Sequence, residues 1–226
     1  MLMNGRLGLD YSSYEMWRKA NNGTNVYSFI APDWNKTIIS RIAWGSFRVT
    51  DGLWVDPSYA PCVQSVTPFL DGRFQMQPYF RLKPAKGTAV SQVQLFLKNR
   101  QMVPNRLPDL IDVEIGQYES AGSWYRDEVQ TALTYHKSEM GEDCEFYSAP
   151  GVIKQFFKPT DTWLNNYGIN MANYSVAFPS APLPILPTSI LVWQLAANAD
   201  ALSYGIVNPP GWSTVLGVSM YIRFDL

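Results

Sequence analysis

The chain alternates between two hydrophobic patterns: short apolar runs, and longer segments in which apolar residues return every three or four positions. The first pattern predicts buried β-strands and the second predicts amphipathic helices. Strands are expected at residues 6–11, 37–45, 73–82, 107–114, 143–149, 168–175, 190–197 and 219–226. Because helical patterns separate most of these strands, the sequence predicts βα units and a largely parallel sheet, and eight strands favour a closed barrel.

The clearest helical pattern covers residues 89–102. Thr88 precedes it as a candidate N-cap, and Val90, Val93 and Leu97 form an apolar stripe at helical spacing. We expect this helix to pack on the outside of the barrel through that stripe.

A second helix is expected between Ser123, a candidate N-cap, and Gly141, a candidate stop signal. Its expected inner face consists of Tyr125, Val129, Leu133, His136 and Met140. His136 is the single histidine of the chain, and its place on an apolar stripe predicts a packed imidazole. We therefore exclude His136 from the candidate chemistry.

The last third of the chain has a different character. Residues 178–187 are rich in proline, and residues 204–217 contain a second cluster of proline and glycine. Neither segment can form a crossover helix, so the final three strands are expected to be joined by irregular loops. The sequence thus predicts one α/β domain over residues 1–226, a distorted TIM-like barrel with about (β/α)5 followed by three strands.

Two carboxylates lie close together on the predicted strand 107–114. Side chains alternate between the faces of a strand, so Asp112 and Glu114 share one face with Leu110. Their Cα atoms should be about 6.6 Å apart, close enough for each charge to oppose ionisation of the other. Asp10 lies near the end of the first strand, where the same alternation can point it inward. All three acids are therefore expected at the C-terminal mouth of the barrel.

Bulk composition narrows the possible partners. The formal net charge is -1 with 16% charged residues, so no overall field favours nucleic acid or an anionic membrane. The first residues contain no long apolar run, so we expect neither a signal peptide nor a transmembrane helix. The 8 Trp and 13 Tyr supply flat rings that can stack on sugars or fill a core.

Several kinds of chemistry lack their residues in this sequence. Cys62 and Cys144 fit no metal spacing, and we expect buried thiols, with a disulfide between them as the alternative. No glycine-rich phosphate-binding motif is present, and no Ser-His-Asp triad can form without a catalytic histidine. We therefore expect no metal and no cofactor.

Clustered inward carboxylates suit glycoside hydrolysis. One protonated acid can supply the leaving-group proton while another stabilises the transition state or activates water. Mutual repulsion raises the pKa of one member of such a pair. The alternatives for an Asp-x-Glu strand are salt-bridged structure and a metal-binding pair.

Eight segments also occur in an order that is typical of one enzyme family. "GLDYSSY" resembles G-[IV]-D-[VI]-S, and "LPDLIDVE" resembles L-P-x-x-x-D-x-E. The other six segments are residues 55–60, 78–84, 91–99, 146–153, 169–175 and 192–197. In these motifs the chain resembles glycoside hydrolase family 25, the barrel muramidases that cut peptidoglycan.

The resemblance implies a role for particular residues. Glu114 would be the general acid, and Asp112 and Asp10 would complete the acidic cluster by orienting the acetamido group of the substrate or placing water. The sugar groove would be lined by Tyr79, Tyr147, Asn173, Tyr174, Trp193 and Gln194. For each aromatic residue, packing inside the barrel is the alternative.

The implied function is a muramidase that hydrolyses the β-1,4 bond between N-acetylmuramic acid and N-acetylglucosamine. Its partner would be the glycan strands of bacterial peptidoglycan. The apparent absence of a signal peptide and of wall-binding repeats indicates a phage lysin, released at lysis or carried in a virion with other virion proteins as partners.

The chain also departs from the family pattern. Ser219 stands nearest to the acid expected on the last strand, with Asp225 six residues later and Asp200 outside that strand. "AWGSF" replaces the usual K-A-[TS]-E-G, and Phe80 stands where a histidine is common. A second hypothesis is therefore a decayed barrel that binds carbohydrate or serves as a structural module of a virion. Retention of the three acids favours the enzyme, because buried like charges cost stability.

Overall fold

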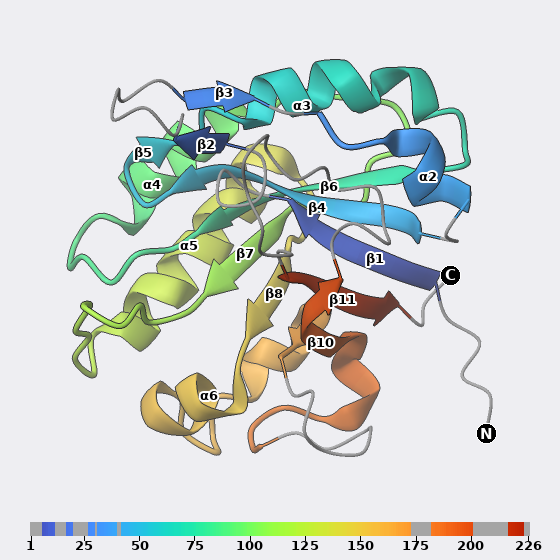
Figure 1. Cartoon of the computed structure of the whole chain (residues 1–226). Helices are drawn as coiled ribbons and strands as arrows, with labels where there is room; N and C mark the ends of the chain where they lie inside the picture. The colour runs from blue at the N-terminus through green and yellow to red at the C-terminus, as the bar shows by residue number, and fades with distance from the viewer. Residues whose placement is uncertain are drawn as a thin grey trace.

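A computed structural model describes residues 6–11, 17–19, 27–29, 31–39, 42–172, 182–200 and 217–223 of the chain. Within them, nine strands form one sheet in the order β1-β11-β10-β9-β8-β7-β6-β4-β5, and β1 also pairs with β4. The strands are β1 (Arg6–Tyr11), β4 (Ile42–Asp51), β5 (Trp54–Val55), β6 (Gln75–Arg81), β7 (Leu110–Val113), β8 (Glu145–Ser148), β9 (Ile169–Met171), β10 (Ile190–Asp200) and β11 (Gly217–Arg223). Because β1 pairs on both sides, eight strands close into a barrel, and β5 is attached to β4 outside the ring (Figure 1).

The strand directions explain why the barrel is distorted. Strands β1, β4 and β6 to β10 are parallel, whereas β11 is antiparallel to both of its neighbours, β10 and β1. The start of β11, rather than its end, therefore lies at the mouth where the parallel strands finish. The predicted distorted α/β barrel is confirmed.

Helices surround the barrel between the parallel strands (Figure 1). They are α2 (Trp34–Ile39), α3 (Tyr59–Val66), α4 (Ala89–Asn99), α5 (Tyr125–Met140) and α6 (Pro150–Phe156), with 3₁₀ turns at 67–69, 162–166 and 187–189. The described part of the β9–β10 connection contains only the last of these turns, as its proline content predicts. The predicted loop at 204–217 lies outside the described residues, except for Gly217, which begins β11.

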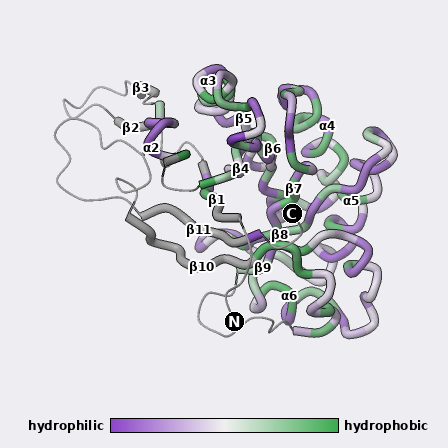
Figure 2. The backbone as a smooth tube through the Cα atoms, turned by 90° about the vertical axis from the view of Figure 1, so that its right-hand side faces the viewer, coloured by the Kyte–Doolittle hydropathy of each residue, from purple (hydrophilic) through white to green (hydrophobic). Residues whose placement is uncertain are grey.

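Strand alternation separates two apolar layers. Ile111 and Val113 of β7 point outward into the layer between sheet and helices, whereas Leu110 packs inside the barrel with Trp44 and Tyr147. Hydrophobic and hydrophilic segments accordingly alternate along α4 and α5 in Figure 2, since one face of each helix meets the sheet.

The end of the barrel interior away from the mouth, here called the barrel floor, is polar and fully buried. Arg223 donates to both oxygens of Glu145, at 3.0 and 2.6 Å, and Gln77 Nε2 donates to Glu145 Oε2 at 2.8 Å. Gln77 Oε1 accepts a hydrogen bond from the Ser46 hydroxyl at 3.1 Å. Three strands are thereby joined to β11 across the inside of the barrel.

Some local predictions were wrong. Residues 37–45 do not form one strand, because α2 occupies 34–39 and β4 begins at Ile42. Trp34 anchors this helix by packing against Phe47 and Phe74, a tertiary contact that overrides the β-branched run. The pair β2 (Trp17–Lys19) and β3 (Tyr27–Phe29) forms a small second sheet that the sequence pattern did not predict.

Both predicted helices are present, but the buried face of α4 and the N-cap of α5 differ from the prediction. In α4 the buried face consists of Ala89, Gln92, Val93 and Phe96, so Val90 and Leu97 are only half-buried. In α5 the N-cap position belongs to Trp124 rather than Ser123, and no side-chain hydrogen bond caps the helix. The αL stop at Gly141 is confirmed, with φ of 70°.

His136, Cys62 and Cys144 are structural residues, as predicted. His136 is fully buried and its Nε2 lies 2.8 Å from Asp109, at the start of β7 and therefore at the end opposite the mouth. Both cysteines are buried free thiols. None of the described helices is long and apolar enough to cross a membrane.

Candidate functional site

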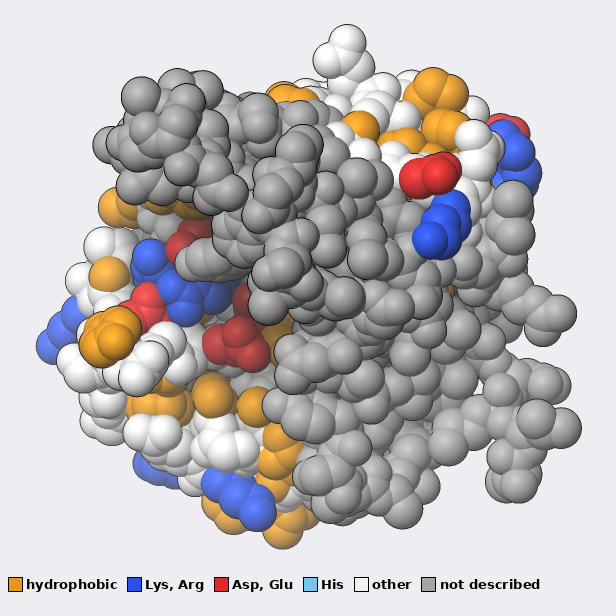
Figure 3. All heavy atoms as spheres, viewed as in Figure 1, with side chains coloured by type: hydrophobic (Ala, Val, Ile, Leu, Met, Phe, Trp, Pro, Cys, Tyr) orange, Lys and Arg blue, Asp and Glu red, His pale blue; other side chains and the backbone are white. Residues whose placement is uncertain are grey.

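A cavity of about 460 Å³ lies at the mouth of the barrel. It is lined by Asp10, Arg48, Asp51, Tyr79, Arg81, Lys83, Asp112, Glu114, Gly116, Gln117, Tyr118 and Glu119. Figure 3 shows red and blue side chains gathered in a hollow, with hydrophobic side chains near it on both sides. The mouth therefore combines acidic and basic groups in one small volume.

Asp10, Asp112 and Glu114 meet in this cavity, where their strand positions predict them. Asp112 is 8% exposed, and its Oδ1 has no hydrogen-bond partner among the described residues. Burial, then the charges of Glu114 and Asp10, raise the pKa of Asp112 well above its ordinary value, although Arg81 and Arg48 oppose the shift. Asp112 is thus held toward its neutral form.

Glu114 lies directly after β7 and is half-buried, so it is more accessible than Asp112. Burial raises its pKa, and the nearby charge of Glu119 adds to the shift. A hydrogen bond with Tyr147 and the charge of Arg81 act in the opposite direction. Glu114 is therefore an accessible acid that keeps its proton to higher pH than an ordinary glutamate.

Arg48 supplies a fixed positive charge beside this cluster. Its Nε donates to Asp56 Oδ2 at 2.9 Å, and Asp56 Oδ1 also accepts the backbone N–H and hydroxyl of Ser58. Burial works against the charge of Arg48, but Tyr79, Asp56 and Asp10 outweigh it and raise the pKa. The sequence pattern did not predict a role for Arg48, although its partner Asp56 belongs to segment 55–60, which resembles a family motif.

A β-bulge in β4 turns Asp51 toward the cavity. The β4–β6 register shifts between Arg48 and Thr50, so that Thr50 lies opposite Phe80 and Asp51 lies opposite Arg81. One extra residue reverses the alternation after Arg48, which puts Asp51 on the inner face. This feature could not be read from the strand pattern, because a bulge leaves the hydrophobic run intact.

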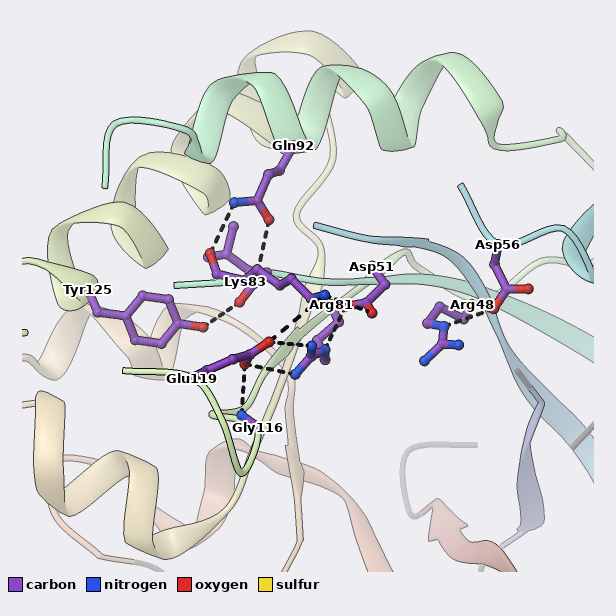
Figure 4. Close-up of polar contacts among 10 residues, drawn as sticks. Arg48, Asp51, Asp56, Arg81, Lys83, Gln92, Gly116, Glu119 and Tyr125 are labelled. Atoms are coloured by element: carbon purple, nitrogen blue, oxygen red, sulfur yellow. Dashed lines mark hydrogen bonds and ion pairs between the residues drawn. The ribbon is translucent and has the colours of Figure 1, made fainter. Parts of the chain in front are cut away.

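Arg81, Asp51, Glu119 and Lys83 form an ion-pair cluster, called here the Arg81 clamp (Figure 4). Arg81 Nε donates to Asp51 Oδ1 at 2.7 Å, and its two Nη groups donate to both oxygens of Glu119 at 2.7 and 3.1 Å. Lys83 Nζ lies 3.2 Å from Asp51 Oδ2. Glu119 Oε2 also accepts the Gly116 N–H at 2.8 Å. The clamp joins the end of β4 to the loop that follows Glu114.

The clamp favours the ionised forms of Asp51 and Arg81. Burial opposes the charge of Asp51, but Arg81 and Lys83 outweigh it and lower the pKa of Asp51. Burial likewise opposes the charge of Arg81, while Glu119 and Asp51 raise its pKa. Paired hydrogen bonds from a guanidinium to a carboxylate fix geometry as well as charge. The clamp is thus a rigid part of the mouth.

Helices α4 and α5 hold the exit of β6 in place, and with it Arg81 (Figure 4). Gln92 Oε1 accepts the Lys83 N–H at 2.9 Å, and Gln92 Nε2 donates to the Lys83 carbonyl at 3.0 Å. The Tyr125 hydroxyl donates to the Leu82 carbonyl. These bonds explain why Gln92 and Tyr125 are buried on helix faces that are otherwise apolar.

The structure separates the other predicted groove residues. Tyr79 lines the cavity and Tyr147 reaches Glu114, although both also belong to the inner apolar layer. Trp193 and Gln194 lie in β10, opposite residues 222 and 221 of β11, and their side chains are outside the described part. Asn173 and Tyr174 lie outside the described residues.

The structure also shows where residues that depart from the family pattern lie. Phe80 is fully buried and its ring packs 4.7 Å from that of Phe96, so position 80 faces the helix layer and not the cavity. Ser219 directly precedes Met220, which pairs with Leu9, and its backbone therefore lies level with Asp10. Asp200 ends β10 opposite Gly217, and Asp225 lies outside the described residues.

Among the described residues, no group of three or more His, Cys, Asp and Glu is arranged to hold a metal ion. The acidic cluster at the mouth is balanced by arginine and lysine side chains. The arrangement suits proton transfer and the binding of a polar substrate.

Comparisons with known proteins bear on the fold. No protein-family model matches the sequence, and no curated protein matches it either. Among solved structures, a family 25 glycosyl hydrolase from Bacillus anthracis is 14% identical with a TM-score of 0.69, covering 98% of this chain and 89% of that one. A muramidase from Trichobolus zukalii is 16% identical with a TM-score of 0.70, covering 98% and 94%.

The catalytic domain of an endolysin from a bacteriophage of Listeria monocytogenes is 14% identical with a TM-score of 0.60, covering 98% of this chain and 94% of that one. The similarity extends over nearly the whole chain in all three comparisons. The chain therefore has the fold of the family 25 glycosyl hydrolases, which the order of its sequence motifs predicts.

Proposed function

We propose that the chain is a peptidoglycan hydrolase, a muramidase that cleaves the β-1,4 bond between N-acetylmuramic acid and N-acetylglucosamine. The observation that carries the proposal is the meeting of Asp10, Asp112 and Glu114 in one cavity at the barrel mouth. The shared fold with a family 25 glycosyl hydrolase and a muramidase supports this choice of chemistry.

Glu114 is the proposed proton donor. Hydrolysis of a glycosidic bond needs an acid that protonates the leaving oxygen, and such an acid must still hold its proton near neutral pH. Glu114 suits this role, because burial raises its pKa above that of an ordinary glutamate and it is the more accessible carboxyl group of the Asp112–Glu114 pair. Tyr147 stabilises the carboxylate that remains after the proton has left.

Asp112 and Asp10 are the proposed partners of that acid. Asp112, held toward its neutral form, can donate a hydrogen bond to the acetamido group of the substrate or position water. Asp10, beside the charge of Arg48, can stabilise positive charge that develops on the sugar. The proposed sugar groove is completed by Tyr79, Tyr147, Asn173, Tyr174, Trp193 and Gln194.

The test is a turbidity assay on purified cell walls from several bacteria, with mass analysis of the released fragments. New reducing-end N-acetylmuramic acid is the expected product. Glu114→Gln should lower its release by roughly 10²- to 10⁴-fold, whereas the matched control Glu139→Gln, an exposed glutamate on α5, should not change it. Fragments with new reducing-end N-acetylglucosamine, or with only peptide bonds cut, would show that the chain cleaves a different bond and would contradict the proposal.

The second candidate is a decayed barrel that binds carbohydrate or serves as a structural module of a virion. Ser219, where the family pattern has an acid, favours it. This candidate predicts that purified cell walls bind the protein but release no fragments, and that Glu114→Gln leaves the binding unchanged.

We also propose a phage origin, either as a lysin released at lysis or as a virion component that contacts other virion proteins. The fold shared with a bacteriophage endolysin supports it. Mass spectrometry of purified particles separates the two forms: peptides of this chain in washed virions identify a component, and their restriction to the lysate identifies a released lysin.

A further inference from the structure

Two aromatic residues are exposed in the described part of the chain, and both lie near the mouth of the barrel. Tyr118 is 94% exposed and Trp54 is 48% exposed. We propose that Trp54 and Tyr118 are sugar-binding platforms at the edge of the acidic cavity, which hold the flanking sugars of a glycan strand. This inference rests on the proposed function, because it assigns the same substrate to a wider surface.

Trp54 stands on one rim of the cavity. It is the first residue of β5 and lies directly opposite Asp51 in the antiparallel β4–β5 pair. Opposite residues of such a pair project to the same face, and Asp51 lines the cavity. Trp54 therefore extends the cavity-facing surface beyond Asp51.

Tyr118 stands on the other rim. It lies in the loop between β7 and α5, four positions after Glu114, and it lines the cavity together with Gly116, Gln117 and Glu119. Its ring is almost wholly exposed, so it contributes little to the core. An exposed ring next to a polar cavity is suited to a ligand with both an apolar face and polar edges.

Hydrogen bonds and ion pairs hold the backbone of both rims in place. Gly52, with φ of +63°, donates its N–H to the Arg81 carbonyl at 2.9 Å, and the Gly116 N–H is held by Glu119. Arg81 pairs with Asp51 on the Trp54 rim and with Glu119 on the Tyr118 rim. The backbone that carries the two rings therefore loses little conformational entropy when a ligand binds.

The chemistry of the occupant follows from this arrangement. Pyranose rings present apolar C–H faces that stack on aromatic rings, while their hydroxyl and acetamido groups need polar partners such as those in the cavity. A polymer that enters the cavity continues past its edges, where the two rings lie. A glycan strand fits better than a monosaccharide, which would reach only one of these surfaces.

Binding is measured by calorimetry in the Glu114→Gln background, so that the ligand is not consumed. The probes are peptide-free peptidoglycan glycan strands several disaccharides long, and the single disaccharide. Trp54→Leu and Tyr118→Leu should each weaken binding of the long strands about 3- to 10-fold, the usual worth of an aromatic contact. Binding of the disaccharide should change less than twofold.

Conservative variants test the need for a ring. Trp54→Phe and Tyr118→Phe should retain most of the affinity, because stacking needs a flat face and not a particular polar tip. Leu53→Ala is the matched control, since Leu53 is 61% exposed on the same turn as Trp54 but has no ring. Equal losses in Leu53→Ala and Trp54→Leu would point to nonspecific apolar contact and overturn the proposal.

Failure of this inference is distinguishable from failure of the proposed function. If wild-type protein cuts cell walls while both leucine variants bind long strands normally, the role assigned to Trp54 and Tyr118 is wrong and the proposed muramidase activity is supported. If no wall is cut but binding of long strands depends on both rings, the proposed activity is wrong and the sugar-binding role of the two rings is supported. Absence of any binding to long strands overturns the platforms as well.

Discussion

The barrel has buried carboxylates at both ends, and they differ in how many hydrogen-bond donors surround them. At the barrel floor, Glu145 receives hydrogen bonds from Arg223 on both oxygens and a further one from Gln77. At the mouth, Asp112 is also buried, but its Oδ1 has no partner among the described residues and its neighbours include two other acids. A carboxylate that serves stability is saturated with donors, whereas one that serves chemistry is left ready to exchange a proton.

The largest expected effect concerns the mouth. Glu114→Gln retains the shape and polarity of the side chain but removes the transferable proton, so release of cell-wall fragments should fall roughly 10²- to 10⁴-fold. The melting temperature should stay the same or rise, because one of two neighbouring acids that repel each other becomes neutral. Activity that survives, or a large loss of stability, would place Glu114 with the structural carboxylates.

At the barrel floor, removal of a charged partner should lower stability strongly. Arg223→Met leaves Glu145 buried without its ionic partner and should cost about 3 to 5 kcal/mol in the free energy of unfolding, measured with urea. The exposed pair of Lys137 and Asp143 provides the control, and Lys137→Met should cost at most about 1 kcal/mol. Similar small costs for both variants would show that the floor network does not stabilise the barrel.

The Arg81 clamp links structure to chemistry at the mouth. Arg81→Met should lower activity about 10- to 100-fold, because the loop after Glu114 loses its anchor. It should also move the high-pH fall of activity to higher pH, since the charge of Arg81 lowers the pKa values of Glu114 and Asp112. Arg73→Met, which breaks only an exposed pair with Asp71, should leave the pH profile unchanged. An unmoved profile in Arg81→Met would reduce the clamp to a structural role.

A smaller effect appears in the dependence of stability on pH. The folded-state pKa of Asp112 is above the unfolded value, so the folded state binds this proton more tightly, and its stabilising contribution is lost as pH rises through the raised pKa. Asp112→Asn removes the cost of ionising this carboxyl group in the folded state. The stability of the variant relative to wild type should therefore increase as pH rises above the pKa of an ordinary aspartate.

Asp71→Asn is the matched control with the opposite sign. The hydrogen bond from Arg73 lowers the pKa of Asp71, so wild type gains stability from this group as pH rises. Thermal melts of the two variants and wild type across a pH series measure both slopes. Parallel curves for Asp112→Asn and wild type would contradict the shift assigned to Asp112.

The sequence by itself determined the features that depend on local periodicity. The alternation of two- and 3.6-residue patterns predicted seven of the eight barrel strands near their observed places and the helices after residues 88 and 123. Strand parity put Asp112 and Glu114 on the inner face, and the apolar stripe of α5 removed His136 from the chemistry. Each of these inferences needs only neighbours within a few positions.

Only the tertiary structure decided how the mouth is built. Arg81 is 30 positions from Asp51 and 38 from Glu119, and the bulge that turns Asp51 inward leaves no mark on the hydrophobic pattern. Helix α2 likewise forms where the sequence favours a strand, because Trp34 packs against rings that lie far along the chain. Periodicity specifies which face of an element is buried, but the partners that meet across that face are set when the barrel closes.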